Sequence, residues 1–110
     1  MERFVKGNVV VLEFPYTDLS KTKKRPSLIV ANLKGDNFVL CQITGQPRPD
    51  PDLINLKKED FQIGGLHRDS FIMPSFVFTI HKSKVDYSAG KIKQEKKKEV
   101  EKKLCEIFTR

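Results

Sequence analysis

Residues 9–31 read VVVLEFPYTDLSKTKKRPSLIVA, and this stretch decides the fold. Its two apolar runs, residues 9–12 and 28–31, have the β-branched content of buried strands. The segment between them is polar and cationic, and a buried core cannot hold it. We therefore expect two strands joined by an exposed loop over residues 16–24, with Arg25 at the loop exit, held extended by the proline that follows it. A loop held between rigid strands is where a small domain places binding and catalytic groups.

The rest of the chain predicts a mainly β fold with one helix. Further strands are expected at residues 38–44, at residues 53–56 on a sheet edge, and over residues 70–80, either as two strands or as one strand bent at Pro74, with one helical turn at residues 57–61. Beyond these, apolar side chains recur at helical spacing, with Lys96 as the single polar interruption, which predicts an amphipathic C-terminal helix. The expected fold class is mainly β (α+β): a small, SH3-like, curled antiparallel barrel of five to six strands with that helix.

Length and charge limit the possible functions. The chain has 110 residues, 38% of them hydrophobic, which suffices for one core, so we expect a single domain over residues 1–110. A formal net charge of +7 favours a polyanionic partner such as nucleic acid or an acidic protein segment, the alternative being a surface charged only for solubility. The lysines of the C-terminal helix alternate with glutamates, as in the i,i+4 pair of Glu99 and Lys103, which indicates a solvated helix face.

The cysteines and the absence of long apolar runs exclude several classes of protein. Cys41 and Cys105 are isolated and lack CxxC spacing, which argues against a zinc site and a disulfide framework, so we expect two buried, reduced thiols. No apolar run approaches the roughly 18 residues of a membrane span, and Glu2, Arg3 and Lys6 interrupt any secretory signal. The expectation is a cytoplasmic protein with no membrane partner, no metal and no cofactor.

Five segments, taken in order along nearly the whole chain, resemble one family. They read KGNVVVL, FPYTD, KKRPSLIV, LCQIT and FQIGGL and begin at residues 6, 14, 23, 40 and 61. In this order and spacing the chain resembles the MazF/PemK family, the toxin halves of type II toxin-antitoxin systems.

The resemblance implies a fold and an activity. The family consists of compact, barrel-like homodimers that act as metal-independent, sequence-specific endoribonucleases on single-stranded RNA, and their activity inhibits growth. Cleavage leaves a 2′,3′-cyclic phosphate and a 5′-hydroxyl. A flexible segment of a cognate antitoxin lies over the dimer groove and blocks the enzyme, and operator DNA is bound only by the toxin-antitoxin complex. The expected protein is therefore an endoribonuclease toxin whose partners are RNA, an antitoxin segment and a second copy of itself.

Two residues are assigned as catalytic by the resemblance. Arg25 matches the family's catalytic arginine, and its guanidinium is a planar fork that can hold phosphate oxygens and stabilise a more negative phosphorane. Thr44 matches a Thr or Ser at a strand end, where its hydroxyl can donate to a phosphate oxygen. Without the resemblance, a surface ion pair for Arg25 and strand propensity for Thr44 are the simpler explanations.

Substrate contacts are expected mainly in the loop after the first strand. Lysines there would contact the RNA backbone, which supplies affinity and not sequence choice. Tyr16 is the aromatic residue expected to be exposed and to stack an unpaired base, whereas Phe14 and Phe61 are expected in the core. The full set of candidate substrate contacts is Tyr16, Thr17, Asp18, Lys23, Lys24 and Gln46.

The proton-transfer groups are not assigned by the resemblance. Some PemK-type toxins carry an additional Arg and Asp on the strand that corresponds to residues 70–76, where this chain has Met73 and Ser75. Asp18 and His67 are the candidates for acid or base that remain. Two other readings stay open: an inactive module of the same fold that binds nucleic acid or antitoxin, and an SH3-like module that binds peptides.

Overall fold

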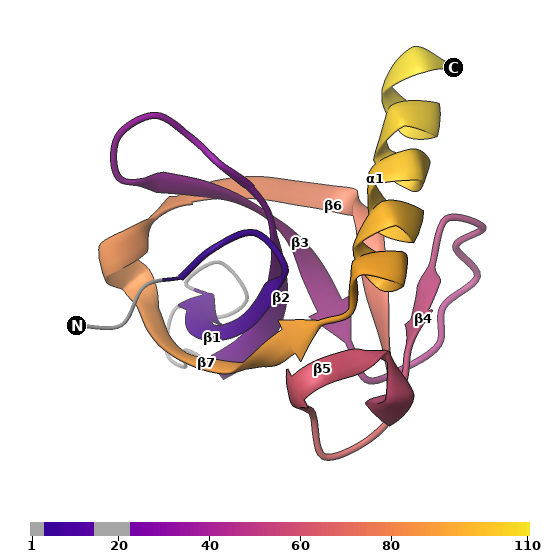
Figure 1. Cartoon of the computed structure of the whole chain (residues 1–110). Coiled ribbons are helices and arrows are strands. Elements are labelled where there is room, and N and C mark those ends of the chain that lie inside the picture. The colour runs from indigo at the N-terminus through magenta and orange to yellow at the C-terminus, as the bar shows by residue number, and fades with distance from the viewer. Residues whose placement is uncertain (1–3, 15–22) are drawn as a thin grey trace.

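The structure is a computed structural model in which residues 4–14 and 23–110 are described. Within them, one antiparallel sheet has the strand order β4-β6-β3-β2-β1-β7-β5. The sheet curls round on itself, and the helix α1 stands against it (Figure 1). The strands are β1 (Asn8–Phe14), β2 (Lys23–Asn32), β3 (Asn37–Thr44), β4 (Ile54–Leu56), β5 (Phe61–Gly64), β6 (Ser70–His81) and β7 (Val85–Ile92). Two 3-10 turns, η1 (Lys58–Asp60) and η2 (Lys82–Lys84), and α1 (Gln94–Thr109) are the other elements.

The predicted fold class, a mainly β curled antiparallel barrel with a C-terminal helix, is confirmed, but the described residues form seven strands and not five or six. The two extra strands are β5 and β7. In β7 only Gly90 and Ile92 are buried, so this strand contributes few side chains to the core. β7 is held instead by backbone pairing to β1 on one side and to β5 on the other, which side-chain patterns do not report.

The strand β2 starts earlier than the sequence suggests. Lys24 and Arg25 lie inside β2 and pair with Glu13 and Leu12 of β1, although they were expected in the loop and at its exit. Pro26 does not end the strand. Pairing of β2 with β3 begins only at Ser27, so Pro26 needs no backbone N–H for a hydrogen bond on that side of β2. As a result, Arg25 is fixed on a strand and not carried on a loop.

Residues 70–80 form one bent strand, which was one of the two arrangements expected. The register with β3 passes from Cys41 opposite Val77 to Gln42 opposite Met73, so residues 74–76 have no partner in β3. This bulge includes Pro74, as expected, and it turns the following side chains outward.

The sheet separates two apolar clusters, because successive residues of a strand face opposite sides. On β2 and β3, Leu28 and Cys41 belong to one cluster, whereas Ile29 and Leu40 belong to the other. The first cluster is covered by α1, whose Val100 is buried within it. The second lies on the side toward which the sheet curls, and Phe38, Val10 and Leu12 complete it.

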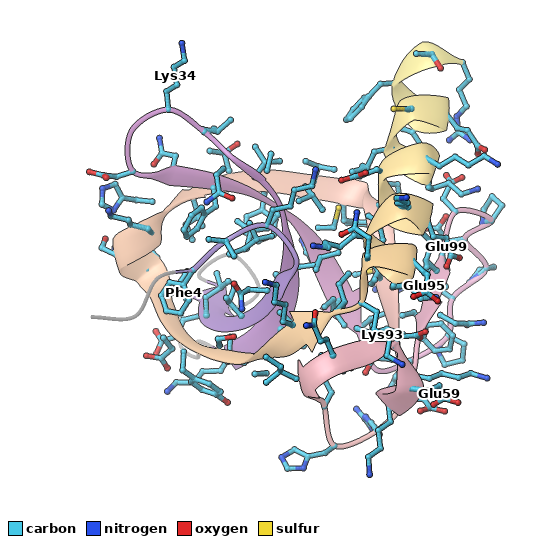
Figure 2. The ribbon with its side chains drawn as sticks, in the orientation of Figure 1. Phe4, Lys34, Glu59, Lys93, Glu95 and Glu99 are labelled. Atoms are coloured by element: carbon cyan, nitrogen blue, oxygen red, sulfur yellow. The ribbon has the colours of Figure 1, made fainter. Side chains whose placement is uncertain are left out.

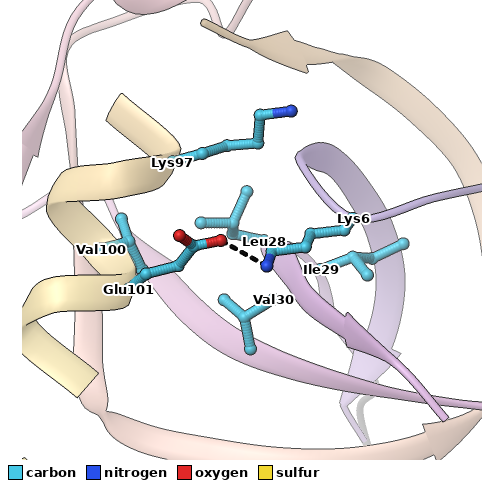
Figure 3. A pocket seen from close by; sticks show the side chains of 7 residues that line it. All are labelled: Lys6, Leu28, Ile29, Val30, Lys97, Val100 and Glu101. Atoms are coloured by element: carbon cyan, nitrogen blue, oxygen red, sulfur yellow. Dashed lines mark ion pairs between the residues drawn. The ribbon is translucent and has the colours of Figure 1, made fainter. Parts of the chain in front are cut away.

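The helix α1 packs through the predicted stripe at Val100 and Leu104, but two residues of the stripe differ: Phe108 at its end is 71% exposed, and Lys96 takes part in the contact. The side chain of Lys96 is largely buried, and its Nζ donates to the backbone oxygen of Asn55 at 2.9 Å and to Glu99 at 2.8 Å. Lys96 therefore ties α1 to β4 and does not interrupt the contact. A further ion pair joins Lys6, just before β1, to Glu101 on α1. The pair lies at a small pocket that the side chain of Val30 also lines (Figure 3). In the described chain, no helix combines the length and the apolar character needed to cross a membrane.

The two cysteines differ, and the expectation of two buried thiols is wrong for one of them. Cys41 is fully buried, and burial raises the pKa of its thiol to about 12. Cys105 is exposed, because it follows Leu104 on α1 and so points away from the packed stripe. Both are free thiols.

Gly64 provides a test of the pairing between β5 and β7. Its φ is +70°, and a Cβ at this position would collide with the carbonyl oxygen of Ala89 on β7. Gly64→Ala should therefore lower the free energy of unfolding by about 2 kcal/mol or more, measured by urea denaturation. The adjacent variant Gly65→Ala is the control, because no atom of residues 4–14 and 23–110 lies within 4 Å of its Cβ position and its φ is not positive. Equal stability of the two variants would contradict this packing.

Candidate functional site

A cleft opens where β2 begins and β3 ends, and it consists of two adjoining hollows. The first has a volume of about 540 Å³ and the second about 230 Å³. Side chains of Arg25, Thr44 and Arg48 line both hollows. The first hollow is strongly cationic, and its polar side chains are Lys24, Arg25, Thr44, Gln46, Arg48 and Arg68.

The position of this cleft follows from strand alternation. On β3, Phe38 and Leu40 point into the second apolar cluster. The next two residues on the same side of this strand are polar, Gln42 and Thr44. On β2 the same side carries Ile29 and, toward the strand start, Arg25. The face that forms a core in the middle of the sheet thus becomes polar at one end. A core-facing strand position that turns polar is a sequence signal for a site.

Arg25 and Thr44 come together by strand register. Ser27 pairs with Gln42, and Arg25 and Thr44 lie two residues beyond this pair, each on the same side of its strand as its paired neighbour. The Nε of Arg25 is buried and has no hydrogen-bond partner within the described part of the chain. Thr44 Oγ1 accepts a hydrogen bond from the backbone N–H of Gln46 at 3.2 Å, which leaves the hydroxyl proton as a donor. The two side chains can therefore offer donors to one anionic group.

Two further arginines belong to the cleft and were not predicted. Residues 45–53, which include Pro47, Pro49 and Pro51, form the connector between β3 and β4. Arg48 lies on this connector, and its Nη1 is 3.6 Å from the sulfur of Met73. Arg68 lies against Gly45, since a Cβ on that glycine would be 2.6 Å from Nη2 of Arg68. Neither arginine belongs to a recognisable sequence motif. Both reach the first hollow only because two separate loops pack near the end of β3. The Arg-Pro-Asp run after Pro47 was the only available signal.

The connector that carries Arg48 is held at two points. The Oδ2 of Asp50 accepts a hydrogen bond from Ser75 Oγ at 3.1 Å. Asp52, which is buried, accepts from both terminal nitrogens of Arg110, at 3.3 and 3.0 Å. The connector is thus fastened to the bulge of β6 and to the end of α1. Met73 and Ser75 stand where some PemK-type toxins carry an Arg and an Asp. In this chain Arg48 of the connector contacts Met73, and Asp50 contacts Ser75.

Lys24 and Gln46, two of the candidate substrate contacts, also line the first hollow. The ammonium of Lys24 is 2.5 Å from Oδ2 of Asp86 on β7, and this hydrogen bond and charge raise the pKa of Lys24. Lys24 therefore already has a carboxylate partner. Gln46 is exposed at the rim. For Lys23 the structure describes the backbone in β2 but not the side chain.

The remaining predicted site residues are not brought into the cleft by the described structure. Tyr16, Thr17 and Asp18 lie outside the described residues, as does the side chain of Phe14. His67 is exposed and precedes Arg68 but does not line either hollow. Phe61 is buried in the core, as expected.

The described part of the cleft contains neither a proton acceptor nor a metal-binding group. Both hollows are lined, among the described residues, without a carboxylate or an imidazole. In residues 4–14 and 23–110, no three His, Cys, Asp or Glu side chains gather as ligands for a metal ion. What these residues supply is positive charge and hydrogen-bond donors, a set suited to phosphate groups.

Comparison with protein families identifies the chain. Residues 5–108 match the family model of the PemK-like, MazF-like toxins of type II toxin-antitoxin systems. The chain belongs to this family. The match includes both strands that carry Arg25 and Thr44. A search of curated protein sequences gave no significant match.

Solved MazF structures share the fold of this PemK-like chain. An endoribonuclease from a mycobacterial species, solved with its cognate antitoxin, has 15% identity and a TM-score of 0.72, with 96% of this chain and 95% of that chain covered. The Mycobacterium tuberculosis toxin MazF-mt6 has 15% identity and a TM-score of 0.71, with 92% and 95% covered. MazF from Deinococcus radiodurans has 16% identity and a TM-score of 0.73, with both chains fully covered at 100%. At such low identity the likeness concerns the fold.

The pairing of Lys24 with Asp86 can be tested with a polyanion. Asp86→Ala frees the ammonium at the cleft, so affinity for a single-stranded oligonucleotide should rise roughly threefold, and the plot of log affinity against log salt concentration should steepen by about 0.7. Fluorescence anisotropy at several salt concentrations measures both. Asp36→Ala is the matched control, because it frees Lys82 from an ion pair of 3.0 Å at the opposite end of β2. If both variants gained affinity equally, net charge and not the cleft would explain the binding.

Proposed function

We propose that this protein is a metal-independent, sequence-specific endoribonuclease toxin that cleaves single-stranded RNA to a 2′,3′-cyclic phosphate and a 5′-hydroxyl. Membership of the PemK-like, MazF-like toxin family supports the activity. The observation that carries the proposal is the Nε of Arg25, which is buried without a hydrogen-bond partner among the described residues, in a cleft that Thr44 and four cationic side chains also line.

The reaction needs charge stabilisation where the phosphorane forms. The ribose 2′-oxygen bonds to phosphorus and loses its proton, and the bond from phosphorus to the 5′-oxygen breaks as that oxygen gains a proton. Arg25 binds a non-bridging oxygen whose charge grows in the transition state, and Thr44 donates a second hydrogen bond. The partial burial of Arg25 strengthens this contact, because water screens it less.

The other cations of the cleft have a positioning role. Arg48 lies between β3 and β4 and Arg68 between β5 and β6, and both line the first hollow. Contacts of Arg48 and Arg68 to the phosphates next to the scissile one would hold the strand along the cleft, with affinity that falls as salt rises. Lys24 and Gln46 add contacts at the rim, and Tyr16 and Thr17, which lie outside the described residues, stay proposed contacts.

The protein partners follow from the same family. The mycobacterial relative was solved with its cognate antitoxin, and Deinococcus radiodurans MazF with MazE. We infer that a cognate antitoxin inhibits this protein by laying a flexible segment with carboxylates into the cationic cleft, that the active form is a homodimer, and that operator DNA is bound only by the toxin-antitoxin complex. Burying carboxylates among arginines would compete directly with RNA phosphates.

One observation favours a second candidate function, an inactive module that binds nucleic acid or antitoxin. It is that no carboxylate or imidazole lines the described part of the cleft. Such a module would bind single-stranded RNA with strong salt dependence and release no cyclic phosphate. End-group analysis of RNA after incubation separates the two functions.

Arg25 is the residue whose loss tests the proposal. The wild-type protein should cleave mixed-sequence, single-stranded RNA in EDTA, and Arg25→Ala should lower the cleavage rate roughly 10²–10³-fold, because one donor to the phosphorane is lost. Lys34→Ala is a control that removes one positive charge from the tip of the turn between β2 and β3, far along β2 from Arg25 (Figure 2). Intact RNA after prolonged incubation with the wild-type protein would refute the nuclease.

The proton acceptor can be assigned by substitution. If Asp18 is the base, Asp18→Asn should abolish cleavage in end-group analysis. If His67 is the base, His67→Gln should abolish it. We propose Asp18, because His67 is exposed and lines neither hollow. Cleavage that is lost in His67→Gln but retained in Asp18→Asn would overturn this assignment.

A further inference from the structure

The second hollow of the cleft differs from the first in the side chains that form it. Its floor includes the apolar side chains of Met73 and Phe76 from β6, which do not reach the first hollow. Phe76 belongs to the bulge of residues 74–76 that has no partner in β3. The bulge buries Pro74 but leaves Phe76 43% exposed. An aromatic ring is thus held open to solvent at a fixed place on the sheet.

Arg48 lies over this ring. Its guanidinium carbon is 5.7 Å from the centre of the Phe76 ring, and its Nη1 is 3.6 Å from the sulfur of Met73. A cation at this distance is attracted to the face of an aromatic ring. The connector that carries Arg48 is itself fastened to the bulge through Asp50 and Ser75, so the guanidinium and the ring are held by one local network.

The two hollows are continuous, because Arg25, Thr44 and Arg48 line both. A phosphate held by Arg25 and Thr44 would therefore stand at the boundary between a cationic space and a space with an apolar floor. In single-stranded RNA each phosphate is followed within one sugar by a flat base with an apolar face and polar edges. Aromatic rings and arginine planes are the groups on which unpaired bases stack in proteins.

We propose that the second hollow binds an unpaired nucleobase next to the scissile phosphate, with Phe76 and Arg48 as the stacking surface. The inference rests on the proposed function for the position of the phosphate, and it adds a specificity-determining contact outside the residues 16–18. If the proposal is right, the preference for a particular base at one position of the cleavage site depends on Phe76 of β6 and Arg48 of the connector. A peptide side chain is the alternative occupant, and the experiment below distinguishes the two.

The experiment uses 2′-O-methyl oligoribonucleotides, which cannot be cleaved, each with a single abasic position. For the full-length wild-type protein, one abasic position should weaken binding about tenfold, the effect of losing one stacked base. Phe76→Ala should bind the intact oligonucleotide about tenfold more weakly and show no further loss at that position. Phe76→Tyr, which keeps the ring, should behave like the wild type. Phe108→Ala is the control, since Phe108 is 71% exposed on α1 and does not line the cleft.

Arg48→Lys is the second variant, because it keeps the charge but loses the flat guanidinium. It should reduce the abasic penalty at the same position while leaving the salt dependence of binding unchanged. Circular dichroism confirms that each variant is folded. An abasic penalty that persists unchanged in Phe76→Ala, or a wild-type protein that does not bind the oligonucleotides at all, would overturn the base pocket.

The base pocket and the nuclease can fail separately. If the wild-type protein shows the Phe76-dependent abasic penalty but releases no cyclic phosphate from RNA, the pocket stands and the nuclease is wrong. If RNA is cleaved with dependence on Arg25 but sequencing shows the same cleavage sites for the wild type and Phe76→Ala, the nuclease stands and the pocket is wrong.

Discussion

The pairing of β2 with β3 is the constraint on which the candidate site depends. It places Ile29 and Leu40 in one apolar cluster, and beyond its last pair, Ser27 with Gln42, Arg25 and Thr44 lie on that same side of their strands. A one-residue shift of β2 against β3 would turn Ile29 out of the core and, with it, Arg25 to the side opposite Thr44. The free energy that holds the core in register therefore also holds the guanidinium next to the hydroxyl.

The state of Arg25 has a physical consequence. A buried N–H donor without a partner costs free energy relative to one that is paired, because it has lost its hydrogen bond to water. Within the described residues, the Nε of Arg25 is in this state, at a cleft that also gathers Arg48 and Arg68. An incoming anion would satisfy the donor and reduce the mutual repulsion of the arginines. The site is thus organised before any ligand binds, which lowers the reorganisation that binding requires.

The periphery of the molecule supports this arrangement through side chains far from the cleft. Asp52 is buried and paired to Arg110 at the end of α1, and Asp50 accepts from Ser75 on the bulge of β6. These contacts define the path of the connector that presents Arg48. The helix, which covers the first apolar cluster, is in this way linked to a side chain that lines a cleft on the other face of the sheet.

The sequence by itself determined the class of the fold, the main strands, the C-terminal helix and the family, because strand and helix periods and the Arg25-Pro26 motif are local patterns. It missed β5 and β7, whose stability comes from backbone pairing to strands distant in the chain, and it misplaced Cys105 because one helical position separates buried from exposed. Only the tertiary structure decided that Arg48, Arg68 and Phe76 join the cleft. Each of these three side chains is placed by a loop packing or a bulge between non-adjacent segments, and no local pattern encodes such a meeting.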